Sequence, residues 1–194
     1  MVLDEAALDT LFRNARTHDV FADTPVTDET LQQLYELVKL GPTSANSSPG
    51  RFLVIRSPEA KEKLRACMSL GNLDKTMAAP VTIVVAQDPY FHTKLLDLYP
   101  GQDIKGWFSG NPDLAEETGF RNSTLQGGYF IMAARALGLA CGPMSGFDRA
   151  KLDRLFFASS AWKSNFLINL GYPKDEELAP RLPRLSFEQA VSVA

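Results

Sequence analysis

The sequence predicts one α+β domain, or a mixed-sheet α/β layer fold, over residues 1–194. Three observations lead to this fold class. Short apolar runs that suit buried strands alternate irregularly with amphipathic helical stretches. Hydrophobic residues make up 45% of the chain and charged residues 22%, which is typical of a globular domain. A length of 194 residues suits a single domain, and we find no internal repeat, low-complexity segment or long linker.

Two helices are predicted before the first strand. Residues 4–16 suit a short helix with one apolar face. Residues 28–40 carry apolar side chains at the i, i+3, i+4, i+7 spacing of a stronger amphipathic helix, which Gly41-Pro42 ends. The apolar residues of the first helix are Leu8, Leu11 and Phe12, and those of the second are Leu31, Leu34, Tyr35 and Val38.

Four short apolar runs predict buried strands. They cover residues 52–55, 81–85, 139–144 and 166–170. A helix over residues 59–68, which include Leu64, separates the first two strands, and another over about 89–98 follows the second. The next stretch, residues 99–112, contains proline, glycine and two aromatic residues, and we interpret it as an irregular loop.

A long helix is predicted from Asn111-Pro112 or Asp113 to about residue 137, with Asp113 and Glu116 suited to a capping pair. Gly127-Gly128 lie inside it and cost about 1 kcal/mol each relative to alanine. We interpret them as a place where another backbone, from a packed helix or a partner subunit, approaches closely; tolerated glycines are the alternative. An apolar stripe on this helix consists of Leu125, Tyr129, Met132 and Ala136.

The last third of the chain alternates short elements with turns. Asp148 is expected to cap a short helix that carries Leu152, Leu155 and Phe156. The tail, residues 174–194, is charged and ends in a weak helix at Phe187-Glu188.

Charge and hydropathy exclude several classes of protein. A net charge of −3 with both signs mixed gives no electrostatic reason to bind nucleic acid or an anionic membrane. The longest apolar runs, such as residues 81–86 and 129–134, are far shorter than the roughly 18–20 residues of a membrane span. The first ten residues are acidic where a signal peptide is basic, so we expect a cytoplasmic protein.

The cysteines and histidines point to neither a disulfide scaffold nor a metal site. Cys67 and Cys141 form no CxxC pair, and we expect two reduced, buried thiols. His18 and His92 lie far apart in sequence, with no partner at the spacing of a zinc site, so no metal is expected. The chain also has no GxSxG or SxxK nucleophile motif, no GxGxxG loop and no P-loop. If the chain is an enzyme, a bound cofactor is therefore expected to carry the chemistry, and no catalytic side chain is assigned.

Two cationic segments could hold a phosphate. Arg16-Thr17-His18 follows the first helix, and an arginine with an adjacent hydroxyl offers the forked and hydrogen-bonding donors that a phosphate dianion needs. Arg181 and Arg184 offer a second cluster near the C-terminus. An exposed arginine at a helix end and two charges on a solvated tail are the alternative interpretations.

Three further segments suit a flat polar ligand. The loop of residues 42–49 is rich in small donors and acceptors, although an ordinary solvated loop would look the same. Asn72 and Lys75 lie three residues apart on one side of a helical turn and could hold the pyrimidine edge of a flavin, or form a surface polar pair. The turn of residues 142–148 leads from a strand to a helix, and its amides could face a ligand.

Taken together and in this order, these segments resemble the FMN-dependent nitroreductase family. The segments are ARTH with a following Phe21, GPTSAN, GNLDKT, LAEETGFRNS, ALGLACGPMSGFDR and RLPRLSFE. The resemblance covers nearly the whole chain and is nearest to a subfamily of short members that includes the malonic semialdehyde reductase of bacterial uracil (pyrimidine) degradation. It implies an α+β fold with a mixed β-sheet flanked by helices, and an intertwined homodimer with FMN at the subunit interface. The long helix with Gly127-Gly128 would then lie in the dimer core.

The resemblance also implies which residues bind the flavin. In this scheme one group holds the phosphate, a second lines the flavin from the other subunit, a third contacts the pyrimidine edge, and a fourth lies near the reactive ring nitrogen. The four groups are, in order, Arg16, Thr17, His18, Arg181 and Arg184; Thr43, Ser44 and Asn46; Asn72 and Lys75; and Met144, Ser145 and Gly146. Trp107 and Phe108 are candidates for covering the open flavin face, with packing in the core as the alternative.

The implied activity is two-electron transfer from NADH or NADPH, through the flavin, to a small acceptor. The subfamily resemblance favours reduction of malonic semialdehyde to 3-hydroxypropionate, with a nitroaromatic or quinone as the alternative and a non-catalytic flavin-binding protein as a second alternative. Three positions depart from the family pattern: Ala15 replaces an arginine of the phosphate motif, Asp19 replaces a basic residue, and Ser145 replaces a glutamate.

Overall fold

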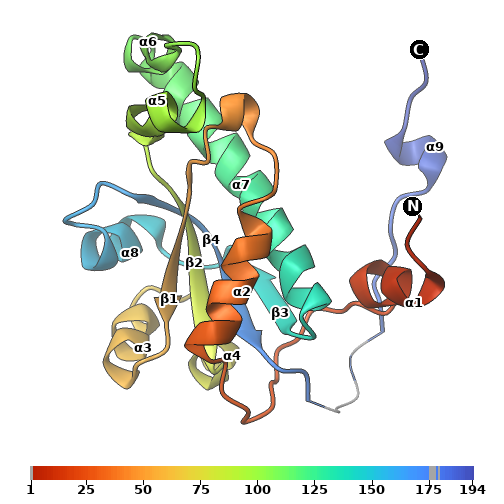
Figure 1. Cartoon of the computed structure of the whole chain (residues 1–194). Coiled ribbons are helices and arrows are strands. Elements are labelled where there is room, and N and C mark those ends of the chain that lie inside the picture. Colours follow the sequence, from red (N-terminus) through yellow and green to blue (C-terminus); the bar gives the residue numbers. More distant parts are fainter. Residues whose placement is uncertain (1, 175–177, 179) are drawn as a thin grey trace.

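The computed structural model describes residues 2–174, 178 and 180–194, and its centre is a four-stranded sheet in the order β1-β2-β4-β3 (Figure 1). The strands are β1 (Gly50–Ile55), β2 (Val81–Gln87), β3 (Ala140–Met144) and β4 (Lys163–Gly171). Each neighbouring pair is antiparallel. The α+β class and all four predicted strands are confirmed. The expected mixture of strand directions is not: in the described residues, parallel pairing is limited to an isolated bridge between Thr17 and Cys141.

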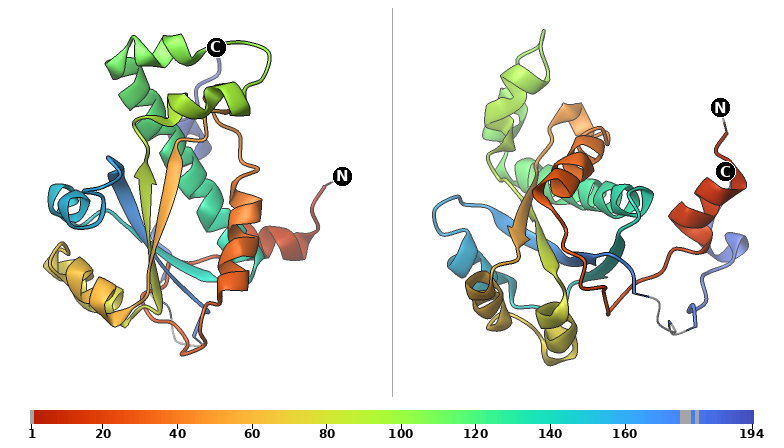
Figure 2. Two further views of the ribbon diagram at one scale, coloured as in Figure 1. Left: turned by 60° about the vertical axis from the view of Figure 1, so that its left-hand side comes forward. Right: turned by 60° about the horizontal axis from the view of Figure 1, so that its bottom comes forward.

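Helices lie on both faces of this sheet, and the described residues form the following ones. They are α1 (Glu5–Leu8), α2 (Asp28–Val38), α3 (Pro58–Arg65), α4 (Leu70–Ala78), α5 (Leu95–Leu98), α6 (Lys105–Ser109), α7 (Pro112–Ala136), α8 (Arg149–Phe156) and α9 (Phe187–Ala190). Single turns of other helix types occur at Asp9–Arg13, Ser44–Asn46 and Phe91–Lys94. Figure 2 shows α2 and α7 on one side of the sheet and α3, α4 and α8 on the other.

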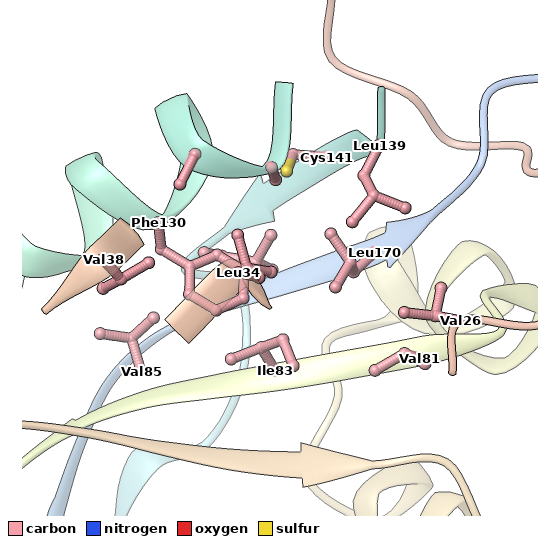
Figure 3. Packing of buried hydrophobic residues seen from close by; sticks show 13 residues of the cluster. Val26, Leu34, Val38, Val81, Ile83, Val85, Phe130, Leu139, Cys141 and Leu170 are labelled. Carbon is pink, nitrogen blue, oxygen red and sulfur yellow. The ribbon is translucent and has the colours of Figure 1, made fainter. Parts of the chain in front are cut away.

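Two apolar cores result from the period-two alternation of the central strand β2. Ile83 and Val85 face α2 and α7, where they pack with Leu34 and Phe130 (Figure 3). Val84 and Ala86 face α3 and α8 and belong to a second cluster with Leu64 and Leu152. Because every residue of β2 is buried, this strand is mostly apolar in the sequence, with Thr82 and Gln87 as its polar residues.

The long helix begins as predicted, but with a different cap. The side chain of Asn111, rather than Asp113, accepts a hydrogen bond from the backbone N–H of Leu114, and Pro112 occupies the first turn. The apolar stripe that begins at Leu125 lies largely on the exposed face of α7, since its Leu125 and Tyr129 are 44% and 40% exposed. The buried face instead carries several polar residues.

Gly127 and Gly128 have different environments. Among the described residues, no other backbone approaches either glycine closely, contrary to the interpretation from the sequence. A Cβ added to Gly127 would lie 2.4 Å from Cζ of Phe166, so the side chain of a strand residue fills this space. A Cβ on Gly128 would have no described atom within 4 Å. Of the two glycines, Gly128 is therefore the one that could contact a partner subunit.

Three other local predictions need correction. Residues 4–16 form one α-helical turn continued by a π-type turn, Asp9–Arg13, instead of one regular helix. The stretch 99–112 is not wholly irregular, because α6 forms where Phe108 anchors a small cluster with Phe91. The helical turn expected around Asn72 and Lys75 extends into the complete helix α4.

The two ends of the described chain lie side by side and apart from the sheet. Figures 1 and 2 both show α1 next to the segment that leads to α9. Arg181 joins them by donating from Nη2 to the carbonyls of Arg13 (2.8 Å) and Ala15 (2.6 Å). Residues 180–194, which we call the C-terminal arm, expose several apolar side chains, including Leu182, Leu185 and Phe187.

Two expectations about the whole chain can be compared with this fold. Cys67 and Cys141 are both buried and free, as predicted. None of the helices in the described part of the chain combines the length and apolar character that crossing a bilayer demands.

Candidate functional site

Residues 16–18 run along the outer edge of strand β3. The backbone N–H of His18 donates to the carbonyl of Cys141 (3.1 Å), and Thr17 bridges the same residue. This approach depends on Gly142, because a Cβ there would lie 2.5 Å from the carbonyl oxygen of His18. Burial raises the pKa of the neighbouring Cys141 thiol to about 12, so this thiol is neutral and serves as packing.

A cationic cavity of about 430 Å³ opens beside this segment. It brings together the phosphate candidates from both ends of the chain, Arg16 and Thr17 with Arg181 and Arg184. Arg135 and Lys174 add two more cations, while Asp19 supplies the one carboxylate among the described lining residues. Such a concentration of guanidinium groups on a chain of net charge −3 is suited to a dianion such as a phosphate.

His18, the third member of the predicted phosphate segment, has a different role in this structure. It does not line the cationic cavity, and its Nδ1 lies 3.2 Å from the carbonyl oxygen of Arg16. The backbone of His18, rather than its ring, therefore fixes the segment to β3.

Helix α4 and the turn after β3 form the second part of the site. The carbonyl oxygen of Gly146 accepts hydrogen bonds from Ser69 Oγ (2.7 Å), Ser69 N (3.1 Å) and Asn72 Nδ2 (3.3 Å). A Cβ on Gly146 would lie 2.4 Å from Asn72 Nδ2 and 2.6 Å from Ser69 Oγ, so a larger residue here would displace the two side chains that bond the turn. Asn72 and Gly146 are thus neighbours, as a shared ligand site requires, and Ser145 lies beside them in the turn.

An ion pair connects α4 to the first segment. Lys75 Nζ lies 3.2 Å from Asp19 Oδ1, and Asp19 is the more exposed partner. Because Asp19 also lines the cationic cavity, this pair places the Lys75 ammonium at the edge of that cavity. The Lys75 ammonium is therefore one ion pair away from a carboxylate that lines the cavity of the phosphate candidates.

The loop of residues 42–49 is held on helix α7 by two buried amides that the sequence analysis did not single out. Asn122 Oδ1 accepts from the backbone N–H of Ser44 (2.8 Å), and Gln126 Oε1 accepts from that of Gly50 (2.7 Å). The loop is strained, because three non-glycine residues have positive φ: Ala45 (52°), Asn46 (48°) and Ser48 (41°). The spacing of Asn122 and Gln126, four residues apart on α7, can be read from the sequence, but their burial cannot.

The side chains of Thr43 and Asn46 make further hydrogen bonds that hold this loop. Thr43 Oγ1 accepts from the backbone N–H of Ser48 (3.0 Å), and Asn46 Nδ2 donates to the carbonyl of Leu98 (2.7 Å). Their side chains thus hold the loop in its strained shape in this chain.

The loop and the cationic cavity lie at opposite ends of the sheet. Helix α4 leads into Val81 at the start of β2, whereas Gln87 at the end of β2 pairs with Gly50 just after the loop. A strand of this length separates its ends by about 20 Å. Figure 1 shows the same separation, with the loop near α5 and the opposite end of the sheet near α4. A single chain therefore does not bring the two groups of predicted residues together.

Trp107 and Phe108 differ in the structure. Phe108 is only 4% exposed, and its ring centroid lies 5.0 Å from that of Phe91. Its expected place over a ligand is therefore wrong for this chain, and core packing is its role. Trp107 is 55% exposed on α6 and is available to contact a second chain or a ligand.

The donor set indicates an anion site and gives no sign of a metal centre. In the described ranges, 2–174, 178 and 180–194, no group of three or more histidine, cysteine, aspartate or glutamate side chains is placed to hold a metal ion. Guanidinium groups, a hydroxyl, an ammonium and an amide are suited to a phosphorylated, planar ligand.

Comparisons with known proteins agree with this geometry. A family model described as the nitroreductase family matches residues 13–172. A protein of Stutzerimonas stutzeri, provisionally named NADH dehydrogenase/NAD(P)H nitroreductase, is 56% identical over 192 residues, 99% of this chain and 98% of that protein.

Solved structures share the fold at much lower identity. A Bacillus subtilis protein, provisionally called a nitroreductase, is 22% identical with a TM-score of 0.88, covering 98% of this chain and 100% of that one. An Exiguobacterium sibiricum protein of the same provisional description, solved in complex with FMN, is 20% identical with a TM-score of 0.78, covering 94% of this chain and 95% of that one. With a family model that spans most of its length and a relative more than half identical from end to end, this chain belongs to the nitroreductase family.

Proposed function

We propose that this member of the nitroreductase family is an NAD(P)H-dependent oxidoreductase that binds FMN as a homodimer. The observation that carries the proposal is the cationic cavity, which joins Arg16 and Thr17 to Arg181 and Arg184, with Lys75 at its edge. The naming of the Stutzerimonas relative and the FMN bound by the Exiguobacterium protein support the same assignment.

The residues of this chain suit each part of FMN. Arg16, Thr17, Arg181 and Arg184 would hold the phosphate by charge-assisted hydrogen bonds, and Arg135 adds a cation in the same cavity. Asn72, Lys75 and the backbone of the turn at Ser145 and Gly146 would contact the ring system, with Met144 alongside. When bound, FMN supplies two-electron redox chemistry between NAD(P)H and an acceptor.

A second copy of the chain would complete the site. Thr43, Ser44 and Asn46 lie near one end of β2, a strand about 20 Å long, and the cavity lies towards its other end. If these residues also line the ligand, they must come from a partner. The exposed apolar residues on α7 and on the C-terminal arm give that partner a surface to cover. They include Leu114, Phe120, Leu125 and Tyr129 on α7, and Leu182, Leu185, Phe187, Val191 and Val193 on the arm.

Lys75 is the group that would favour transfer of charge to the ring. Its ammonium, held on a regular helix, is preorganised to stabilise negative charge that develops at the pyrimidine edge. Asp19 opposes this effect, since its carboxylate pairs with Lys75. Ser145 lacks the carboxylate found in other members, so donation at that position would come from the backbone.

We propose malonic semialdehyde as the acceptor, reduced to 3-hydroxypropionate by two electrons and two protons. The support is the subfamily resemblance of the six segments described above. A nitroaromatic or a quinone is the second candidate, favoured by the nitroreductase naming of the Stutzerimonas relative. Each acceptor is small enough to lie against a planar ring at the edge of the cavity.

The first experiment asks whether the chain carries and reduces a flavin. Purified protein is expected to be yellow and to lose its colour on addition of NADH or NADPH under anaerobic conditions. Turnover is then compared among malonic semialdehyde, nitroaromatics and quinones. Protein that takes up no added FMN would refute the oxidoreductase. FMN uptake without reduction by NADH or NADPH would identify a non-catalytic flavin-binding protein.

Lys75→Ala tests the electrostatic role. We expect flavin reduction to slow by about 10- to 100-fold, the usual effect of removing one preorganised charge-stabilising group. Lys63→Ala, which changes an exposed lysine of α3, serves as the control. Unchanged reduction kinetics in Lys75→Ala would remove Lys75 from this role.

A further inference from the structure

A buried polar network lies beneath the C-terminal end of helix α4. Lys61 Nζ on α3 donates to the carbonyl of Thr76 (2.8 Å) and to Thr82 Oγ1 on β2 (2.8 Å). Thr82 in turn donates to Asn169 Oδ1 on β4 (2.9 Å). Asn169 Nδ2 then reaches the carbonyl of Lys75 (3.3 Å) and Thr76 Oγ1 (3.4 Å). Two consecutive carbonyls of α4 are thus held by side chains from the body of the molecule.

The network occupies a place where apolar packing would be expected. Thr76, Thr82 and Asn169 are completely buried, and Thr82 and Asn169 face each other across β2 and β4. In the part of the chain that the structure describes, no carboxylate lies within ion-pair distance of Lys61. Desolvation lowers the pKa of Lys61 to about 8. The two hydrogen bonds of Lys61 Nζ, to the Thr76 carbonyl and to Thr82 Oγ1, offset the cost of burying this ammonium.

The position of the network relative to the site gives it a role. A cation and hydrogen-bond donors at the last carbonyls of a helix satisfy its free acceptors and offset the negative end of its dipole. Here the side chains reach the carbonyl of Thr76 and that of the adjacent Lys75, which also accepts from the backbone N–H of Ala79. Thr76 Oγ1 also donates to Met144 Sδ (3.3 Å), so the network touches the strand that leads into the Ser145-Gly146 turn.

We propose that Lys61, Thr82 and Asn169 are positioning residues, which fix the end of α4 and thereby set where the Lys75 ammonium meets the bound flavin. The inference rests on the proposed function, since it assumes that Lys75 faces FMN. It assigns no contact with the flavin to the three residues themselves.

The test uses a matched pair at Thr82. Thr82→Val keeps the volume of the side chain but removes the hydroxyl that joins Lys61 to Asn169, whereas Thr82→Ser keeps the hydroxyl. In the FMN-loaded protein we expect Thr82→Val to slow flavin reduction by about tenfold and Thr82→Ser by no more than about twofold.

The same pair in a Lys75→Ala background separates positioning from a general loss of structure. If the network acts through Lys75, Thr82→Val should slow reduction by no more than about twofold once that ammonium is absent. An equal slowing in both backgrounds would overturn the proposal, as would wild-type kinetics in folded, FMN-loaded Thr82→Val.

A measurement without flavin distinguishes failure of this inference from failure of the proposed function. Hydrogen exchange at the amide of Ala79, which bonds the carbonyl of Lys75, should be faster in Thr82→Val than in Thr82→Ser. Equal exchange in the two variants would overturn the network's hold on α4. If the variants differ but no form of the chain binds FMN, the proposed function is wrong and the flavin role assigned to the network is wrong with it.

Discussion

Gly142→Ala is expected to weaken the binding of FMN while leaving the binding of riboflavin nearly unchanged. The new Cβ would lie 2.5 Å from the carbonyl oxygen of His18, and real Cβ atoms essentially never approach another heavy atom closer than 3.0 Å. Residues 16–18 must therefore move away from β3 by at least about 0.5 Å. That shift takes the 3.1 Å hydrogen bond from His18 N to Cys141 O beyond normal length and costs about 1 kcal/mol.

The effect on affinity follows from what this segment carries. Arg16 and Thr17 line the phosphate cavity and move with His18. Losing one hydrogen bond to a charged phosphate costs about 1.5–3 kcal/mol, which corresponds to an FMN dissociation constant raised by about 10- to 150-fold. Riboflavin has the same ring system without the phosphate, so the ratio of the two dissociation constants isolates the phosphate contribution.

Fluorescence titration or calorimetry with both ligands measures this ratio. Gly106→Ala is the control, because a Cβ at that position has no described atom within 4 Å. A folded Gly142→Ala protein that keeps the wild-type ratio would refute the assignment of residues 16–18 to the phosphate. An equal loss for both ligands would also refute it, since the damage would then lie at the ring.

Gly127→Ala should lower the free energy of unfolding in urea by about 1–3 kcal/mol, because the new Cβ would meet the Phe166 ring. Adding Phe166→Leu to this variant should recover part of the loss. A Gly127→Ala protein as stable as wild type would contradict this packing. Between pH about 8 and 10.5 the unfolded chain binds more protons at Lys61 than the folded chain does, so the stability of wild type relative to Lys61→Met should rise with pH across that window. If urea unfolding gives the same free-energy difference between wild type and Lys61→Met across this pH range, the lowered pKa of Lys61 is wrong. Cys67 and Cys141 have raised pKa values and are buried, so a thiol reagent at about pH 8 should label them only after unfolding; rapid labelling of native protein would count against their burial.

Local patterns were sufficient for much of the fold. The mostly apolar run at β2 and the long periodic segment of α7 are visible in the sequence, because burial on both faces and a helical period leave direct traces. Helix α6 was missed, since its five residues are ordered by the contact of Phe108 with Phe91 and not by their own propensity. Gly127 was misinterpreted because nothing near it in sequence indicates that Phe166 fills the space.

The candidate site divides in the same way. Arg16, Thr17, Asn72 and Lys75 could be proposed from residue chemistry, since phosphate and flavin edges need those donors. Asn122, which holds the backbone of Ser44, gave no such signal, because a buried amide on a helix looks like any other polar residue in one dimension.

By itself, the sequence determined the type of fold, the strand and helix segments, and the kinds of group available to bind an anion. Composition and periodicity act locally, and they are set by which side chains must leave water. Only the tertiary structure decided which groups meet: Arg16 with Arg181 and Arg184 in one cavity, and Lys61 with the carbonyl of Thr76, next to Lys75. It also separated the loop of residues 42–49 from that cavity by the length of a strand, because contacts between residues distant in sequence depend on the order and register of the sheet.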